Sequence, residues 1–416
     1  MTATVLMTLA LPDGTGAHRV AAQLAAAFRR EGHRVVLLCG PGSKADVDPL
    51  LLGDSEAPPA GDVTVLRHDG FRRALDWSLV SEIQRVVSRE AVDCLVAFQQ
   101  ADRKYAALAA RRAGIPFVIH AGNQHAFWGP WPVPPLKAQL YGWLLRRCAD
   151  LIVCTSEAVQ AEFVERFRVP AERTCVQPNG IDVHGLARPG AGTLEGVRRE
   201  LGVGPRDVLL LNAGRLDVQK GQDLLLRAFA PIAASRPDVK LALVGAVPGS
   251  RNRRRMERFA KELRDFAGSR GLGAQVVFTG WRDDVQRLLA AADLYVHSAR
   301  WEGPALCLSV LEAMAAALPV ISTDCSGHPA GFQNGRHGFI VASGAVRPLR
   351  EAVERILALT REQRRAMGAR ARALAVERYD SRVSSARCVA LVEDRLSCGR
   401  GRAGASRPRG WEARRG

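Results

Sequence analysis

Residues 298–324 read Ser298-Ala-Arg-Trp-Glu302-Gly-Pro304-Ala-Leu-Cys307-Leu-Ser-Val-Leu-Glu312-Ala-Met-Ala-Ala-Ala-Leu-Pro-Val-Ile-Ser-Thr-Asp324. This order predicts a strand end, an acidic turn, a helix and a further strand, and Pro304 suits the first helical position because it has no N–H. In open parallel sheets, ligands bind where strands end and helices begin, since helix N–H groups attract anions there. Two interpretations remain open: an anion and sugar site flanked by Glu302 and Glu312, or a buried βαβ unit with two solvated glutamates.

Short apolar runs alternate with helical patterns on both sides of this stretch, as is typical of parallel sheets covered by helices. In the first half we expect strands at 5–11, 35–39, 63–66, 92–97, 116–120 and 151–155, and helices at 78–89, 102–113, 135–148 and 157–167. In the second half we expect strands near 208–213, 239–244, 276–279 and 294–297, helices near 222–234, 254–270 and 283–291, and a helical stretch at 348–395. The chain is therefore predicted to be α/β, with two nucleotide-binding-like halves.

Composition divides the chain further. We expect an N-terminal domain at 1–185, a Gly/Pro-rich linker at 186–205, a C-terminal domain at 206–377, a helix at 378–396 that packs back on the N-terminal domain, and a basic tail at 397–416. Residues 399–416 contain six arginines and one acidic residue, Glu412. The rest of this stretch is rich in Gly, Ser and Pro and cannot build a core, so the tail is predicted to be disordered.

Charge and cysteine usage limit the class of protein. The formal net charge is +17, and neither the tail nor the basic cluster at 251–255 is accompanied by a nucleic-acid motif, so nucleic acid is not an expected partner. Nine cysteines without a C-x-x-C pair favour a reduced cytoplasm with neither a disulfide framework nor a zinc site. No apolar run reaches the roughly 18 residues of a membrane span, and the N-terminus resembles a strand rather than a signal peptide. A cytoplasmic location is expected.

Two further stretches carry alternatives. The turn at Gly14-Thr15-Gly16 is either a plain turn or a place where the backbone closely approaches a substrate. The aromatic run Phe127-Trp-Gly-Pro-Trp131 precedes Leu140, Trp143, Arg146 and Arg147. It is either core or cleft lining, or an element that contacts an anionic membrane, which would place the protein peripherally at the inner face of the cell membrane.

Several motifs, taken together in order and spacing, resemble the retaining glycosyltransferases of family 4 over residues 1 to about 395. Besides the opening stretch they are Gly14-Thr-Gly16, Gly32-His33, Ser156-Glu-Ala-Val159, Pro178-Asn-Gly-Ile-Asp182, Gly214-Arg-Leu-Asp-Val-Gln-Lys220-Gly221, Leu243-Val-Gly245, Val277-Phe-Thr-Gly280-Trp-Arg-Asp-Asp-Val285, Ala292-Asp-Leu-Tyr-Val-His-Ser298 and Asn334-Gly-Arg-His-Gly-Phe-Ile-Val341. The resemblance implies the GT-B fold, in which two Rossmann-like domains have parallel sheets facing a central cleft.

The resemblance also implies an activity. A sugar would pass from a UDP-, GDP- or ADP-sugar, with retained anomeric configuration and no required metal or other cofactor, to an acceptor hydroxyl. The acceptor would be a sugar, a lipid-linked glycan or a small molecule, as in the synthesis of cell-envelope polysaccharide or glycolipid. Two alternatives stay open: a non-transferase sugar-nucleotide enzyme such as an epimerase, and a weakly active nucleotide-binding homologue.

The site residues follow from the same resemblance. Arg215 and Lys220 match the basic pair that neutralises the departing diphosphate, Glu312 matches the ribose-binding glutamate, and Glu302 matches the acid beside the donor sugar. The remaining donor-binding residues expected are Gly14, Gly16, Gly214, Gly280, Trp281, Arg282, Ala305, Leu306 and Cys307.

Two departures from the family pattern matter. Seven residues separate the two glutamates in the family, whereas nine separate Glu302 from Glu312 here. Either a longer loop after Gly303 lets Glu302 reach the site, which we favour, or the first acid is displaced. In the loop after Pro116, Gly122 occupies the place of the family's histidine, and His120 is the candidate that replaces it, with His125 on the other side. The alternative interpretation is that His120 has only a structural role.

Overall fold

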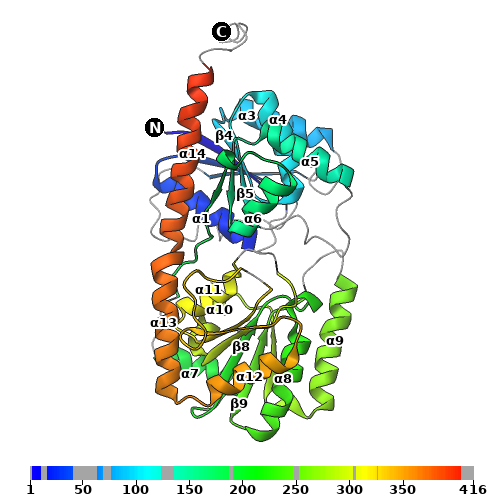
Figure 1. The fold of residues 1–416 in the computed structure, drawn as a ribbon, viewed down its shortest axis with the longest axis vertical. Coiled ribbons are helices and arrows are strands. Elements are labelled where there is room, and N and C mark those ends of the chain that lie inside the picture. Colours follow the sequence, from blue (N-terminus) through cyan, green and yellow to red (C-terminus); the bar gives the residue numbers. More distant parts are fainter. Residues whose placement is uncertain are drawn as a thin grey trace. The chain divides into compact units, whose positions relative to one another are not determined.

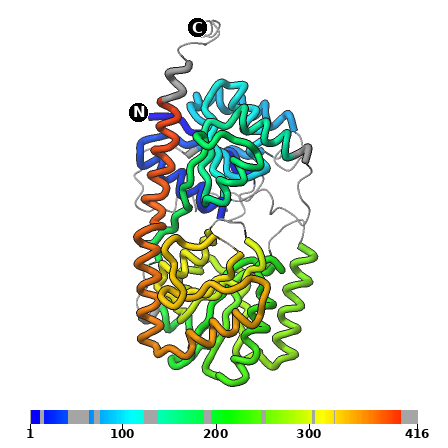
Figure 2. Tube along the Cα trace, viewed as in Figure 1, coloured from blue at the N-terminus to red at the C-terminus, as the bar shows by residue number. Residues whose placement is uncertain are grey.

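The computed structural model describes residues 2–10, 16–40, 63–68, 76–122, 135–186, 191–247, 253–302, 306–325 and 327–403. The chain forms two compact units (Figures 1 and 2). Unit 1 contains Met1–Gly180 and Arg382–Gly416, and unit 2 contains Ile181–Ser381. Each unit is a parallel sheet wrapped by helices, so the prediction of two Rossmann-like α/β domains is confirmed.

Unit 1 has a seven-stranded sheet in the order β3-β2-β1-β4-β5-β6-β7. Its strands are β1 (Thr4–Leu9), β2 (Arg34–Cys39), β3 (Val63–Arg67), β4 (Cys94–Ala97), β5 (Phe117–Ala121), β6 (Leu151–Cys154) and β7 (Thr174–Val176). Its helices include α1 (Gly16–Arg30), α3 (Trp77–Arg89), α4 (Gln100–Ala113), α5 (Pro135–Cys148) and α6 (Glu157–Ala161). The central strands are mostly apolar because both of their faces are buried.

Unit 2 has a six-stranded sheet in the order β10-β9-β8-β11-β12-β13. The strands are β8 (Val208–Ala213), β9 (Val239–Val244), β10 (Val276–Gly280), β11 (Leu294–His297), β12 (Val320–Thr323) and β13 (Gly338–Val341). The helices include α7 (Ala191–Glu200), α8 (Gln222–Ser235), α9 (Arg253–Ser269), α10 (Val285–Ala291), α11 (Leu308–Ala315), α12 (Val346–Leu357) and α13 (Arg361–Tyr379). Residues of α8, α9 and α12 form the core on one face of this sheet, and those of α7, α10, α11 and α13 form the core on the other.

The strand order of unit 2 reverses between β8 and β11. At such a switch point the connections leave in opposite directions and open a crevice at the carboxyl ends of the two strands, where ligands bind in doubly wound sheets. Both the segment that holds Lys220 and the stretch that begins at Ser298 follow these two strands directly. The topology therefore brings two distant parts of the sequence together at one place.

The expected linker at 186–205 is different in the structure. Residues 191–200 form helix α7, and Val197, Leu201 and Val203 are buried in the core of unit 2. The guanidinium of Arg198 donates to the carboxylate of Asp293 at 3.0 Å and anchors this helix. The glycines of the segment suggested a connection, but its apolar residues repeat at helical spacing and outweigh them.

The C-terminal helix α14 (Ser381–Ala403) extends beyond the expected end at residue 396, and residues 404–416 lie outside the described part of the chain. This helix belongs to unit 1, in which Cys388, Val389 and Val392 are buried and Glu393 lies 3.0 Å from Nε2 of the buried His33. The helix expected at 157–167 is shorter, because α6 passes into a π-helical turn at Glu162–Arg166. None of the described helices is both long and apolar enough to cross a membrane.

One carboxylate is buried in unit 1 at the start of α4. Asp102 has no solvent exposure, and the hydroxyl of Thr8, near the end of β1, donates to it at 3.3 Å. Burial raises the pKa of Asp102 to about 7, although the neighbouring Arg103 guanidinium lowers it in part. Across the range between the ordinary Asp pKa and about 7, the folded chain binds more protons than the unfolded chain.

Because the pKa is raised in the folded state, the protonated form of Asp102 favours folding at low pH, and this contribution is lost as the pH rises toward 7. We predict that Asp102→Asn gains stability relative to the wild type over this range, by about 1–4 kcal/mol between pH 5 and 8. Thermal unfolding at several pH values measures it. Glu165→Gln, at an exposed position of the same unit, is the matched control. A difference that does not change with pH would contradict the prediction.

Candidate functional site

The site begins at a tight turn after β8. Residues Val218–Lys220 form a short 3-10 helix capped by Asp217, and Gly221 follows with a φ of 64°. A Cβ at Gly221 would lie 2.0 Å from the carbonyl oxygen of Ser298, so only glycine permits this approach. The hydroxyl of Ser298 in turn donates to the carbonyl of Lys220 at 3.0 Å. The turn after β8 is thereby fixed against the segment after β11.

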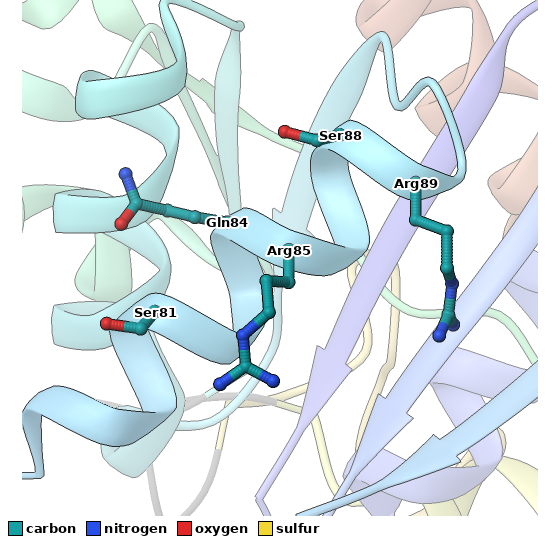
Figure 3. A pocket seen from close by; sticks show the side chains of 5 residues that line it. All are labelled: Ser81, Gln84, Arg85, Ser88 and Arg89. Atoms are coloured by element: carbon teal, nitrogen blue, oxygen red, sulfur yellow. The ribbon is translucent and has the colours of Figure 1, made fainter.

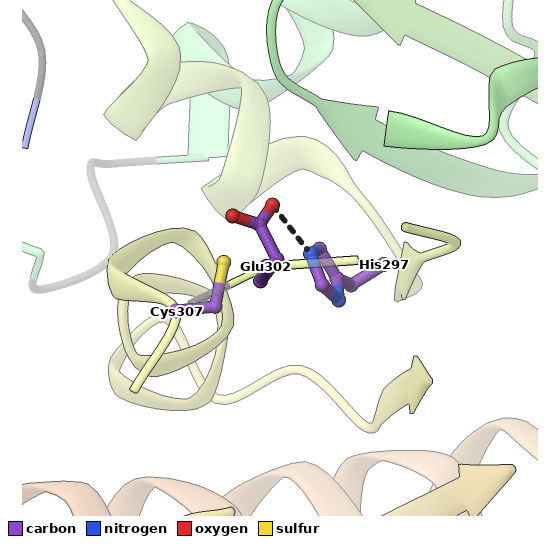
Figure 4. Close-up of side chains that lie close together, drawn as sticks. All are labelled: His297, Glu302 and Cys307. Carbon is purple, nitrogen blue, oxygen red and sulfur yellow. Dashed lines mark hydrogen bonds and ion pairs between the residues drawn. The ribbon is translucent and has the colours of Figure 1, made fainter. Parts of the chain in front are cut away.

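Four side chains meet where these segments touch. Lys220 and Glu302 form an ion pair, and Nε2 of His297 lies 3.4 Å from the Glu302 carboxylate. Figure 4 shows Cys307 on the other side of Glu302, and the ligand atoms of His297, Glu302 and Cys307 all lie within 4.8 Å of one another. The side chains of Lys220, Glu302 and His297 are only 19%, 16% and 4% exposed. This polar cluster is therefore largely shielded from water.

The charges in the cluster shift one another. Burial raises the pKa of Glu302, but Lys220 and His297 together lower it to about 2, so the carboxylate is ionised at neutral pH. Burial lowers the pKa of Lys220, but Glu302 raises it above its ordinary value overall. Burial likewise lowers the pKa of His297, and Cys307 and Glu302 raise it to about 9. For the Cys307 thiol, burial raises the pKa and the facing His297 brings it down to about 7.

The unusual spacing of the two glutamates leaves Glu302 in the site. Its carboxylate forms an ion pair with Lys220, and the longer loop after Gly303 stays a prediction. The helix of the opening stretch begins at Leu308 rather than near Pro304, and Cys307 occupies its N-cap position. Pro304 and Ala305 lie outside the described residues, whereas Leu306 is half-buried and forms a bridge with Gly327.

Glu312 is buried on α11, about one turn after the helix begins at Leu308. The hydroxyl of Tyr295, on the neighbouring β11, donates to Ser309 at 2.8 Å, and Ser309 Oγ lies 3.2 Å from the Cys307 thiol. Burial, and then the charge of Cys307, raise the pKa of Tyr295, and the Glu312 carboxylate raises it further. Glu312 and Cys307 therefore both lie close enough to the Tyr295 hydroxyl to raise its pKa.

Arg215 and Gly214 lie directly after β8. The Arg215 guanidinium donates to the side chain of Gln219 at 3.2 Å, within one turn of Lys220. The two cations are close enough for Arg215 to lower the pKa of Lys220 in part. Gly245 packs against Gly214, since a Cβ at Gly245 would lie 2.0 Å from the Gly214 carbonyl. Arg215 and Lys220 are thus brought together as the sequence predicts.

The residues expected at the nucleotide base are arranged differently. Gly280 ends β10 with a φ of 73°, and Trp281 is 63% exposed, with its indole N–H donating to Asp283 at 2.7 Å. The guanidinium of Arg282 is held by two carboxylates, those of Asp284 and Glu200. A nucleotide would have to displace one or both of these carboxylates before it could contact the Arg282 guanidinium.

The remaining predicted residues belong to unit 1. Gly16 begins α1, and Gly14 lies outside the described residues. His120 lies near the end of β5, stacked on Phe98 with ring centroids 5.4 Å apart. Burial, and then the Arg103 guanidinium, lower the pKa of His120 to about 4, so its imidazole is neutral at neutral pH.

Sequence reasoning missed His297 as a member of the site. Its signal was its place at the very end of a predicted strand, five residues before Glu302, where a side chain leaves the sheet at its carboxyl edge. An open depression of about 620 Å³ on α3 contains none of the predicted residues. It is lined by Ser81, Gln84, Arg85, Ser88 and Arg89 (Figure 3).

Known families match both halves of the chain. The model described as Glycosyltransferase Family 4 matches residues 14–184, and the one described as Glycosyl transferases group 1 matches residues 195–374. The chain belongs to glycosyltransferase family 4. The GDP-mannose-dependent alpha-(1-6)-phosphatidylinositol monomannoside mannosyltransferase of Mycolicibacterium smegmatis is 26% identical over 82% of this glycosyltransferase and 87% of the relative.

Another relative is the Escherichia coli UDP-Gal:alpha-D-GlcNAc-diphosphoundecaprenol alpha-1,3-galactosyltransferase, 24% identical over 64% of this chain and 66% of its own. Among solved structures, Anabaena HepE in complex with UDP and glucose has a TM-score of 0.78 at 24% identity and covers 94% of this chain and 99% of its own. Sucrose-phosphate synthase from Thermosynechococcus elongatus has a TM-score of 0.73 at 18% identity, covering 95% and 100%. These likenesses show the GT-B fold of this glycosyltransferase.

The Lys220–Glu302 pair is predicted to be energetically coupled. In a double-mutant cycle with Lys220→Met and Glu302→Gln, we expect a coupling energy of roughly 1–3 kcal/mol. Lys220→Met leaves the shielded Glu302 with His297 alone, and Glu302→Gln leaves the shielded Lys220 without its carboxylate. Urea unfolding of the four proteins measures the coupling energy. The exposed pair Lys261–Asp265 supplies the matched control cycle, which should show a coupling of at most about 0.5 kcal/mol. Equal coupling in the two cycles would contradict the prediction.

Proposed function

We propose that this glycosyltransferase is a retaining enzyme that transfers a sugar from a nucleotide-sugar donor to the hydroxyl of a glycolipid or glycan acceptor. The observation that carries the proposal is the shielded cluster of Lys220, Glu302 and His297, which lies beside Arg215 at the switch point of unit 2. Relatives named as GDP-mannose-dependent and UDP-Gal enzymes, and a fold neighbour crystallised with UDP-glucose, support a nucleotide-sugar donor.

The diphosphate would lie between Arg215, Lys220 and the N-terminal end of α11. Two cations and the positive end of the helix dipole at the start of α11 would stabilise the negative charge that grows as the glycosidic bond breaks. A positioned donor of this kind contributes about 2.7–4 kcal/mol in well-studied acyl-transfer sites. Glu312 would accept hydrogen bonds from the ribose hydroxyls, and the base would lie near Gly280 and Trp281.

Glu302 would hold hydroxyls of the donor sugar. Its pairing with Lys220 and His297 keeps it ionised but makes it a weak nucleophile, since both neighbours stabilise its negative charge. This favours attack by the acceptor hydroxyl on the face from which the diphosphate leaves, with the departing diphosphate helping to remove the acceptor proton. Lys220 is already oriented by Glu302, so it needs little rearrangement when the diphosphate binds.

An aromatic and basic row on unit 1 favours a lipid-linked acceptor. The guanidinium of Arg112 lies 5.7 Å from the ring of Trp77 on α3, and that of Arg147 lies 5.3 Å from the ring of Trp143 on α5. Arg111 links these two tryptophan–arginine pairs, because its guanidinium donates to the carbonyl of Arg147 at 3.0 Å. Trp77, Trp143 and Leu140 are 56%, 50% and 59% exposed. Exposed indoles beside guanidinium groups suit the interface of an anionic membrane.

The donor assignment is tested with UDP-, GDP- and ADP-sugars. We expect one of them to bind and to be hydrolysed slowly, and Glu312→Ala to weaken its binding about 10- to 100-fold through the loss of hydrogen bonds to a charged acceptor. Glu351→Ala, on the exposed face of α12, is the control. Unchanged affinity in Glu312→Ala would show that the ribose assignment is wrong.

The same panel separates the alternatives. Consumption of the nucleotide sugar into an isomer without acceptor would indicate an epimerase-like enzyme. Binding of nucleoside diphosphate with no turnover in the presence of lipid-linked and soluble acceptors would indicate a binding homologue. Proton NMR of a transferred product decides between retained and inverted anomeric configuration.

For the membrane surface, we predict that the protein floats with vesicles containing anionic phospholipid at low salt, and less at high salt because screening weakens the arginine contribution. Trp143→Ser should reduce the bound fraction several-fold, since a desolvated indole is lost. Val376→Ser, at an exposed apolar position of unit 2, should leave the bound fraction unchanged. If the protein floats at neither salt concentration, this surface is not a membrane contact.

A further inference from the structure

The cluster of His297, Glu302 and Cys307 contains a set of ligand atoms that the glycosyl transfer itself does not explain. One imidazole nitrogen, one carboxylate oxygen and one thiol sulfur lie within 4.8 Å of one another, and Figure 4 shows Glu302 between the other two side chains. In a tetrahedral zinc site, ligand distances of about 2.0–2.3 Å place these atoms somewhat closer together, at roughly 3.3–3.8 Å. Side-chain rotations that move these ligand atoms by about 1 Å would bring them to the separations of a zinc site.

The imidazole is held in the orientation that a metal ligand requires. Nδ1 of His297 lies 3.2 Å from the hydroxyl of the buried Ser322, which leaves Nε2 directed at Glu302. A hydrogen bond to the far nitrogen fixes the ring and its tautomer in metal sites. His297 is 3% exposed, so the neighbouring protein and not solvent holds this geometry.

The chemistry of the set selects the class of ion. Thiolate and imidazole ligands favour Zn²⁺ and related transition metals, whereas Mg²⁺ and Ca²⁺ prefer oxygen ligands throughout. Three protein ligands leave a fourth position open. The sequence predicts no zinc site because Cys307 has no neighbouring cysteine, and the fold assembles the set from the end of β11, the loop after it and the N-cap of α11.

We propose that His297, Glu302 and Cys307 bind Zn²⁺ or a chemically similar divalent ion, and that this ion competes with Lys220 for the Glu302 carboxylate. On binding, the Cys307 thiol and the His297 imidazolium each release a proton to solvent, and the sulfur and Nε2 coordinate the metal with no change of oxidation state. Lys220 then loses its partner and faces a dication. The metal is therefore an inhibitor of the donor site, and this inhibitory effect rests on the proposed function.

The test is a titration of the reduced, metal-free full chain with Co²⁺ alone. We expect one ion per chain, a sulfur-to-cobalt charge-transfer band and the intense visible bands of four-coordinate Co²⁺, all displaced by Zn²⁺. Cys307→Ser should remove the charge-transfer band, His297→Gln should weaken binding at least about tenfold, and Ser322→Ala should weaken it about tenfold. Cys175→Ser, a half-buried thiol in unit 1, is the control and should change nothing.

Lys220→Met distinguishes this competition from adventitious binding, because it removes the competing cation and should tighten Co²⁺ binding. No charge-transfer band in the wild type, an undiminished band in Cys307→Ser, or weaker binding in Lys220→Met would overturn the proposal. Circular dichroism checks that each variant folds, and Cys307→Ala replaces Cys307→Ser if that variant does not. The titration needs no sugar nucleotide, so its failure leaves the proposed transfer intact, and an inactive donor panel leaves the metal result intact.

Discussion

The ion pair between Lys220 and Glu302 is the contact on which the rest of the site depends. It joins the turn after β8 to the loop after β11, which are the two strands on either side of the switch point in unit 2. Both charges are shielded from water, so each would be costly to leave alone. Gly221 and Ser298 make the pair possible, since the absence of a side chain at Gly221 lets the two backbones touch.

Placing opposite charges at this point has a chemical logic. A phosphate site made only of cations would repel itself when empty, and here Arg215 and Lys220 share the neighbourhood with an ionised carboxylate that lowers the repulsion. His297 adds a second cationic partner to the same carboxylate. The arrangement keeps Lys220 charged and oriented, which is the electrostatic preorganisation that the proposed transfer of a charged leaving group would require.

Much of the fold could be predicted from the sequence, because strands such as β4 and β6 are continuous apolar runs that are buried throughout. The family resemblance assigned Lys220 and Glu302 to one expected donor site but did not predict the ion pair between them. The rest of the side-chain network was not predicted either, and two errors have physical causes. The glycines of residues 186–205 predicted a linker where helix α7 forms. The contact of Glu200, at the end of this helix, with the Arg282 guanidinium was therefore not predicted. His297 and Cys307 lie ten positions apart, and only the path of the loop between them determines whether they meet.

The division of the chain also bears on the order in which it is made. Unit 1 is discontinuous, because its last helix is encoded after the whole of unit 2. During synthesis, residues 181–381 can complete their own sheet and both of their core layers while unit 1 still lacks Cys388, Val389 and Val392. The apolar surface that receives these side chains stays uncovered until the ribosome has released α14. Nascent unit 1 therefore exposes apolar surface for longer than unit 2 does, and such surface favours aggregation.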